Sequence, residues 1–141
     1  MLRQVDGFGA RLGPQRPKHL AVGLSGEREA LFYLRGLGFV VVARRWKSAR
    51  LRGDVDLVAW DGETLCFVEV KTRTGRDAME PADAAVDAPK QEMLRKMARA
   101  YLKGFPRELR DEVRVRFDVV SVYMMAAGPE FELRRGAFVW E

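Results

Sequence analysis

The chain has 141 residues, of which 48% are hydrophobic and 32% are charged, and its formal net charge at pH 7 is +5. This length and composition suit one domain with its own core and leave little room for a second. With one cysteine, Cys66, and one histidine, His19, the chain can form neither an internal disulfide nor a Cys/His zinc site. This favours a reducing compartment and, for any bound metal, oxygen ligands.

The first predicted segment is a flexible basic leader over residues 1–23, which is rich in glycine and proline. We expect one domain over residues 24–141. No apolar run approaches the length of a membrane span, and the leader lacks the continuous apolar core of a secretory signal. The sequence therefore predicts a cytoplasmic protein without a membrane partner, while a transit-like leader stays open as an alternative.

A helix is predicted after the leader, with Ser25 as its N-cap and Gly38 at its end. Its apolar residues repeat at helical spacing: Ala30, Leu31, Leu34 and Leu37. Residues 39–45 are β-branched and apolar and predict a strand. A run of five basic residues without an acid then follows: Arg44, Arg45, Lys47, Arg50 and Arg52. Such a run either holds a phosphate backbone or forms a solvated edge, and Trp46 within it either stacks on an unpaired base or anchors the loop.

Residues 53–71 predict a β-hairpin, because Asp61-Gly62 between two apolar runs is a strong turn signal. With the turn centred there, Asp54 would lie opposite Glu69, and Asp56 would lie diagonal to Glu69. The three acids and Lys71 would then share one face of the hairpin. Carboxylates so placed repel one another unless a cation lies between them, and Mg²⁺ prefers oxygen ligands. The alternative is an exposed hairpin end with surface ion pairs to Lys71.

The remaining elements complete an α/β pattern. Residues 72–86 look irregular, and Asp87 is typical of an N-cap for a helix that runs through Lys103. Residues 114–125 alternate and predict a strand, after which Gly128-Pro129 would form a turn before a short strand over 131–133. The order of one helix, three strands, a second helix and further strands predicts an α/β sandwich around a mixed sheet.

Five short motifs occur in order: Gly26-Glu27, Gly53-Asp54-Val55-Asp56-Leu57, Phe67-Val68-Glu69-Val70-Lys71, Lys90-Gln91 and Arg116-Phe117-Asp118-Val119-Val120. Together they resemble the YraN family of small bacterial proteins, from about Gly26 to Phe138. Asp56 followed by Glu69-Val70-Lys71 also resembles the D…(D/E)-x-K signature of the restriction-endonuclease-like nucleases. One departure is Asp54, where the family more often has Glu. The resemblance implies a restriction-endonuclease-like α/β/α sandwich, with a mixed central sheet and flanking helices.

The resemblance also implies the roles of individual residues. Asp56, Glu69 and the backbone carbonyl of Val70 would hold one or two Mg²⁺ or Mn²⁺ ions, and Glu27 would be an additional metal or water ligand. Lys71 would orient the attacking water or help to deprotonate it. The implied activity is a metal-dependent endonuclease that hydrolyses phosphodiester bonds in DNA, with a branched or single-stranded substrate as an open choice. The residues expected to contact nucleic acid are Arg44, Arg45, Lys47, Arg50, Arg52, Lys90 and Gln91.

Other interpretations stay open. By itself Glu27 is typical of an acid that complements a helix N-terminus, and Lys90 and Gln91 are typical of a solvated first turn. Asp118 lies inside an apolar strand, so we expect its carboxylate to be buried and bonded to backbone donors or to an arginine. The whole chain could instead be a nucleic-acid-binding module or a protein-interaction adaptor that keeps the fold without cutting. The sequence leaves open whether the chain forms a homodimer.

Overall fold

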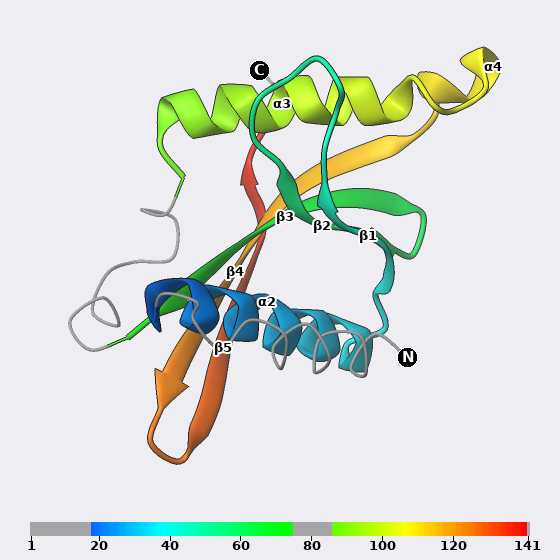
Figure 1. Cartoon of the computed structure of the whole chain (residues 1–141). Helices are drawn as coiled ribbons and strands as arrows, with labels where there is room; N and C mark the ends of the chain where they lie inside the picture. Colours follow the sequence, from blue (N-terminus) through cyan, green and yellow to red (C-terminus); the bar gives the residue numbers. More distant parts are fainter. Residues whose placement is uncertain (1–17, 75–85, 141) are drawn as a thin grey trace.

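The computed structural model describes residues 18–74 and 86–140. In chain order the elements are α2 (Lys18–Gly36), β1 (Val40–Trp46), β2 (Val55–Asp61), β3 (Thr64–Arg73), α3 (Ala88–Leu102), α4 (Arg107–Arg110), β4 (Arg114–Met125) and β5 (Gly128–Phe138). Within these residues the strands form one five-stranded sheet in chain order. Strands β3 and β4 are parallel and the other neighbours are antiparallel, which confirms the predicted mixed sheet (Figure 1).

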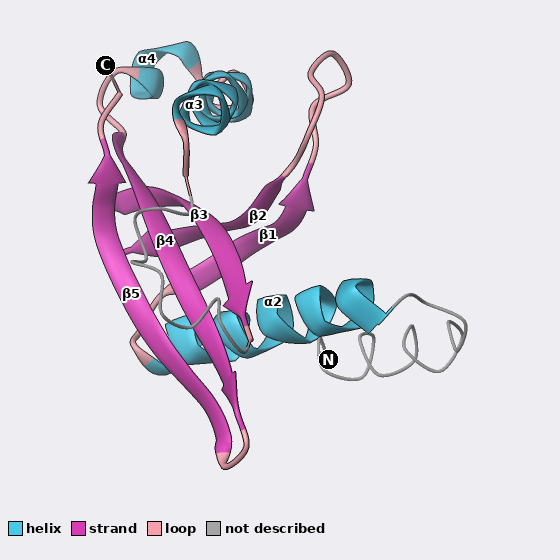
Figure 2. Cartoon of the chain, turned by 90° about the vertical axis from the view of Figure 1, so that its left-hand side faces the viewer, coloured by secondary structure: helices cyan, strands magenta, loops and turns pink. Residues whose placement is uncertain are grey.

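Two hydrophobic cores lie on opposite faces of the sheet, one under α2 and the other under α3 (Figure 2). Leu31 of α2 packs in the same core as Leu57 and Val68, and Met97 of α3 packs in the other core with Val58 and Phe67. Successive side chains of a strand point to opposite faces, so neighbouring apolar residues such as Leu57 and Val58 enter different cores. The central strands therefore read as continuous apolar runs, and the molecule is an α/β/α sandwich.

Helix α2 begins at Lys18, seven residues before the predicted N-cap, Ser25. Ser25 therefore lies inside the helix and is not its N-cap, and residues 18–23 of the predicted leader are helical, while residues 1–17 lie outside the described residues. The sequence has no proline between Pro17 and Gly36, and a glycine inside a helix costs only about 1 kcal/mol, which tertiary packing readily offsets. None of the described helices is long and apolar enough to cross a membrane.

The β2–β3 hairpin is confirmed, but its predicted register is wrong. Asp61 pairs with Thr64, so the two-residue turn is Gly62-Glu63 rather than Asp61-Gly62. Gly62 has a φ of 61°, and Asp61 is kept in the strand because its carboxylate accepts a hydrogen bond from Arg116 at 2.7 Å. The pairing is shifted by two residues, an even number, so the paired side chains keep their predicted faces while their partners change. Val55, before the paired stretch, was predicted to share a face with Leu57 but packs with Val58 in the other core.

The second half of the chain largely follows the prediction. Asp87 caps α3 by accepting the backbone N–H of Lys90 at 3.0 Å, and β4 has the predicted bounds. The last strand is longer than predicted, because Met125 pairs with Gly128 and the turn precedes Gly128-Pro129. Strand β3 extends through Arg73 into the stretch predicted to be irregular, of which residues 75–85 lie outside the described residues.

Asp118 has the predicted structural role. Its carboxylate accepts hydrogen bonds from the Arg116 guanidinium at 2.8 and 2.9 Å and from the backbone N–H of Gly136 at 3.0 Å. The register between β4 and β5 shifts at this point, and Gly136 has a φ of 63°. Asp118 therefore stabilises an irregularity in the sheet, and a buried carboxylate with this many donors satisfies its charge locally.

Gly26 determines how closely α2 lies over β3. A Cβ atom at this position would overlap Oγ1 of Thr72 and would lie 3.0 Å from the Cβ of Thr72. Only glycine permits this approach, which places the next residue, Glu27, beside the hairpin.

We predict that Gly26→Ala lowers the free energy of unfolding by roughly 1–3 kcal/mol, because the added methyl group must displace Thr72. Gly23→Ala is the matched control in the same helix, where nothing lies within 4 Å of the new Cβ. That change should stabilise the protein by up to about 1 kcal/mol through helix propensity. Urea unfolding measures both changes, and equal effects at the two positions would contradict the close approach of α2 to β3.

Candidate functional site

Strands β2 and β3 diverge at Asp56. Their backbone pairing runs from Asp61 and Thr64 to Leu57 and Val68, one residue short of Asp56. There Oδ2 of Asp56 accepts the backbone N–H of Val70 at 2.8 Å. A strand amide lies in the plane of its sheet, so the carboxylate is drawn into the gap between the strands. The sequence predicted instead that it stands on one face, diagonal to Glu69.

The carboxyl groups of Asp56 and Glu69 meet in this gap, and we refer to them as the acid pair. The pKa of Asp56 is raised to about 8, first by burial and then by the negative charge of Glu69, although the Val70 amide acts in the opposite direction. Glu69 is 8% exposed, and in the described chain its Oε1 atom is buried without a hydrogen-bond partner. Two desolvated carboxyl groups are thus held together with an oxygen left for a further ligand.

Lys90 brings positive charge to the acid pair from the first turn of α3. Its Nζ lies 3.3 Å from Oε2 of Glu69. Burial alone would lower the pKa of Lys90, but the charges of Glu69, Asp56 and Asp54 outweigh that effect and raise it. Lys71, the lysine of the E-x-K motif, is exposed on β3. The structure therefore places one lysine against a carboxylate of the pair and leaves the other accessible from solvent.

Glu27 approaches the acid pair from α2, on the other side of the sheet from α3. Burial raises its pKa, a hydrogen bond from Arg45 lowers it, and the charge of Asp56 raises it further, with a smaller contribution from Asp54. The bond from Nε of Arg45 to Oε1 of Glu27 is 2.9 Å long. Arg45 has a φ of 45°, a left-handed conformation that is uncommon for residues other than glycine. This backbone geometry directs the Arg45 side chain to Glu27, so Arg45 positions that carboxylate.

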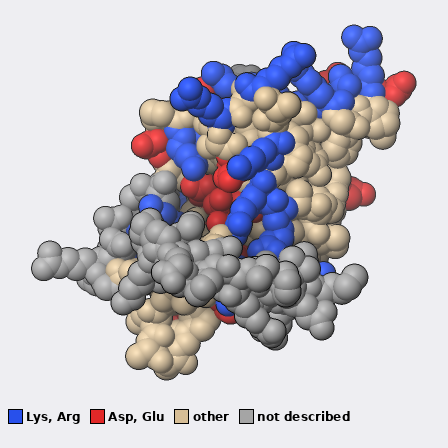
Figure 3. Space-filling view, viewed as in Figure 1, with Lys and Arg blue, Asp and Glu red and all other residues tan. Residues whose placement is uncertain are grey.

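The other residues predicted to contact nucleic acid lie on β1, in the connection between β1 and β2, and on α3. Lys47, Arg50 and Arg52 are exposed in the connection between β1 and β2. Figure 3 shows acidic side chains gathered on one face, with lysines and arginines bordering them. The Gln91 amide donates to the Val86 carbonyl at 3.1 Å and accepts from Arg95 at 3.3 Å. Gln91 thus links the first turn of α3 to the backbone that precedes the helix. Its contact with nucleic acid stays a prediction.

The acid pair fits a hard divalent cation only in part. Both carboxylates and the unpartnered Oε1 of Glu69 are oxygen donors, which Mg²⁺ and Mn²⁺ prefer. Among the described residues, however, no three His, Cys, Asp or Glu side chains come together as a metal-binding group. Any ion held here would complete its coordination with a backbone carbonyl and water, as Mg²⁺ commonly does.

Comparison with known proteins identifies relatives of this chain. The family described as "Uncharacterised protein family UPF0102" matches residues 26–122. A UPF0102 protein of Koribacter versatilis is 41% identical over 126 residues, which cover 89% of this chain and 85% of the relative. A UPF0102 protein of Solibacter usitatus is 47% identical over 116 residues, which cover 82% of this chain and 84% of the relative. The solved structure of Pyrococcus furiosus SfsA in complex with Ca²⁺ is 19% identical, covers 79% of this chain and 59% of that chain, and has a TM-score of 0.33, a likeness too distant to carry an argument.

We predict that Asp56→Asn stabilises the metal-free protein above neutral pH. In the folded protein the pKa of Asp56 is about 8, whereas the ordinary pKa of an aspartate, as in the unfolded chain, is 3.8. Between these values the unfolded chain releases the proton and the folded chain keeps it, so this carboxyl contributes stability below about pH 4 that is lost as the pH rises to about 8. Asparagine stays neutral and can still accept the Val70 amide. The melting temperature of the Asp56→Asn protein at pH 8 with EDTA should exceed the wild-type value by several degrees.

Thermal unfolding followed by circular dichroism between pH 5 and pH 9 measures this difference. Glu108→Gln on α4 is the control, because it removes an exposed carboxylate that takes no part in the candidate site. Its pH profile should follow that of the wild type. Parallel profiles for Asp56→Asn and the wild type would show that burial of this carboxyl does not affect stability.

Proposed function

The chain belongs to the uncharacterised protein family UPF0102, and we propose that it is a nuclease-like protein that hydrolyses phosphodiester bonds in DNA with a bound Mg²⁺ or Mn²⁺. The observation that carries the proposal is the meeting of Asp56 and Glu69 in the gap between β2 and β3. Two buried carboxylates destabilise a fold unless a ligand compensates their charge. A perturbed acid in such a position is typical of a functional site.

In this proposal Asp56, Glu69 and the backbone carbonyl of Val70 hold one or two metal ions, with Glu27 as a further metal or water ligand. The unpartnered oxygen of Glu69 and the oxygen-only donor set support this assignment. A bound divalent ion would lower the pKa of a water molecule and stabilise charge on the phosphate. Arg45 keeps the Glu27 carboxylate in place by its hydrogen bond.

The lysines of the chain have separate roles in the proposal. Lys71 is exposed, so it can orient an incoming water or help to remove its proton. Lys90 lies against Glu69, where it balances the charge of the acid pair in the absence of substrate and can donate to a phosphate oxygen when one is present. The exposed Lys47, Arg50 and Arg52 would hold the phosphate backbone beside the site.

A second candidate function is a module that binds nucleic acid without cutting it. The ion pair between Lys90 and Glu69 favours this alternative, because the ammonium group already offsets one carboxylate that a metal would need. The lack of a group of three metal-binding side chains in the described chain supports it as well. Such a module would bind DNA in a salt-dependent manner that EDTA does not change.

We predict that Mn²⁺ binds the wild-type protein and that Asp56→Asn and Glu69→Gln each abolish this binding in isothermal titration calorimetry. Cleavage of a panel of single-stranded, branched and duplex DNA should require Mg²⁺ or Mn²⁺. Either variant should slow cleavage by roughly 100-fold or more, as expected for the loss of a group that stabilises the transition state. Lys71→Ala should slow cleavage while Mn²⁺ still binds, which separates catalysis from metal binding.

Glu108→Gln serves again as the control and should bind metal and cleave as the wild type does. DNA affinity without Mn²⁺ affinity would instead support the binding module. A protein that binds neither metal nor DNA would refute both candidates and leave the protein-interaction adaptor. Cleavage that survives Asp56→Asn would disprove the assignment of the catalytic residues.

A further inference from the structure

A pocket lined mainly by aromatic side chains lies where the end of β1 meets the last turn of α3. Its volume is about 300 Å³, and its walls are Trp46, Ala100, Tyr101, Gly104 and Phe105. We refer to it as the aromatic pocket. The ring centroids of Trp46 and Tyr101 are 5.1 Å apart at an interplanar angle of 73°, and those of Tyr101 and Phe105 are 6.1 Å apart at 52°. Neither contact is a parallel stack, so the rings do not cover one another face to face.

We propose that the aromatic pocket receives an unpaired base of the DNA strand bound at the acid pair, an inference that rests on the proposed function. Every base has a flat π-face, so stacking on aromatic side chains holds single strands with little sequence preference. A base inside a continuous duplex is already stacked and paired and cannot enter such a pocket. The proposal therefore assigns the site to single-stranded DNA or to the unpaired parts of branched DNA.

The charges around the aromatic pocket match a polyanionic occupant. The exposed cations Lys47, Arg50 and Arg52 follow Trp46 directly, and Lys103 is exposed between Tyr101 and Gly104. No acidic residue occurs between Val40 and Gly53. A strand whose base enters the pocket would thus have cations on both sides for its phosphates, the arrangement that single-strand-binding grooves use.

The distance between the aromatic pocket and the acid pair suits a strand that runs along α3. Lys90 contacts Glu69 at the first turn of this helix, and Tyr101 lines the pocket at its last turn. Eleven residues of α-helix advance by about 16 Å. A stacked strand advances by about 3.4 Å per nucleotide, so the pocket would take a base four or five nucleotides from the phosphate at the site.

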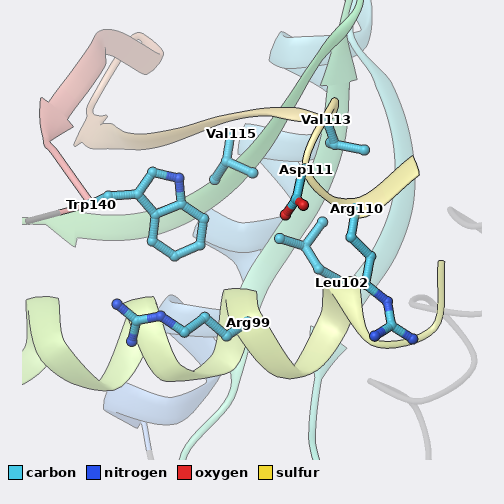
Figure 4. A pocket seen from close by; sticks show the side chains of 7 residues that line it. All are labelled: Arg99, Leu102, Arg110, Asp111, Val113, Val115 and Trp140. Carbon is cyan, nitrogen blue, oxygen red and sulfur yellow. The ribbon is translucent and has the colours of Figure 1, made fainter. Parts of the chain in front are cut away.

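A second pocket on α3 is less suited to this role and provides a control. It has a volume of about 320 Å³ and lies between α3 and β4, near Trp140 (Figure 4). Arg99 covers the Trp140 ring at 5.3 Å, and the Arg110 guanidinium donates to the backbone carbonyls of Lys103 and Phe105. The carboxylate of Asp111 faces this pocket in Figure 4 and would repel a nucleotide phosphate.

The test is fluorescence anisotropy in EDTA, with labelled oligothymidylate and a labelled blunt duplex of the same length as probes. Ala100→Leu fills the aromatic pocket without removing a ring or a charge, and Val113→Leu does the same in the second pocket. Trp46→Ala is avoided because Trp46 also packs against the core. The wild type should prefer the single strand. Ala100→Leu should weaken oligothymidylate binding about tenfold, within the range for loss of one stacked base, and should leave duplex affinity unchanged.

Val113→Leu should bind both probes as the wild type does. Equal single-strand affinity for Ala100→Leu and the wild type would overturn the inference while leaving the proposed function intact, and so would equal weakening by Val113→Leu. Tighter binding of the duplex than of the single strand would overturn it as well. If neither probe binds, the proposed function fails first and this inference falls with it.

Discussion

The carboxylate of Asp56 accepts the backbone amide of Val70 at the point where β2 and β3 separate, and the candidate site depends on this bond. It holds the carboxylate beside Glu69 and away from solvent, which raises the pKa of Asp56 to about 8. The bond gives the backbone amide of Val70 a hydrogen-bond partner where β2 and β3 no longer pair. The same bond holds the Asp56 carboxyl beside Glu69, and the two acids repel each other when both are charged. Lys90 relieves that conflict in part from α3.

The fold was largely predictable because its signals are local. Asp87 lies just before an amphipathic run with Pro89 in its first turn, and residues 114–125 alternate between apolar and polar, so α3 and β4 could be placed from spacing alone. The start of α2 could not, since Ser25, a residue type preferred at N-caps, lies inside the helix. The hairpin turn failed for another reason, because Asp61 belongs to an ion pair with Arg116, 55 residues away.

The candidate site was predictable in its members but not in its geometry. The spacing of Asp56 and Glu69 on adjacent strands indicated that both acids lie together, and a register error of two residues did not separate them. The roles of Lys90 and Arg45 follow from contacts between distant elements, 3.3 Å to Glu69 and 2.9 Å to Glu27. No periodicity marks either contact, although the Asp87 cap fixes Lys90 in the first turn of α3 and is a partial signal. The metal, the catalytic roles and the DNA contacts stay predictions.

Three layers of the sandwich contribute to one point. Glu27 comes from α2, Lys90 comes from α3, and the acid pair lies in the gap of the sheet between them. Neither helix alone can assemble this set of charges, which exists only when both cores have formed. A ligand bound in the gap would therefore bind only the fully folded domain, and its binding would raise the free energy of unfolding of the whole domain.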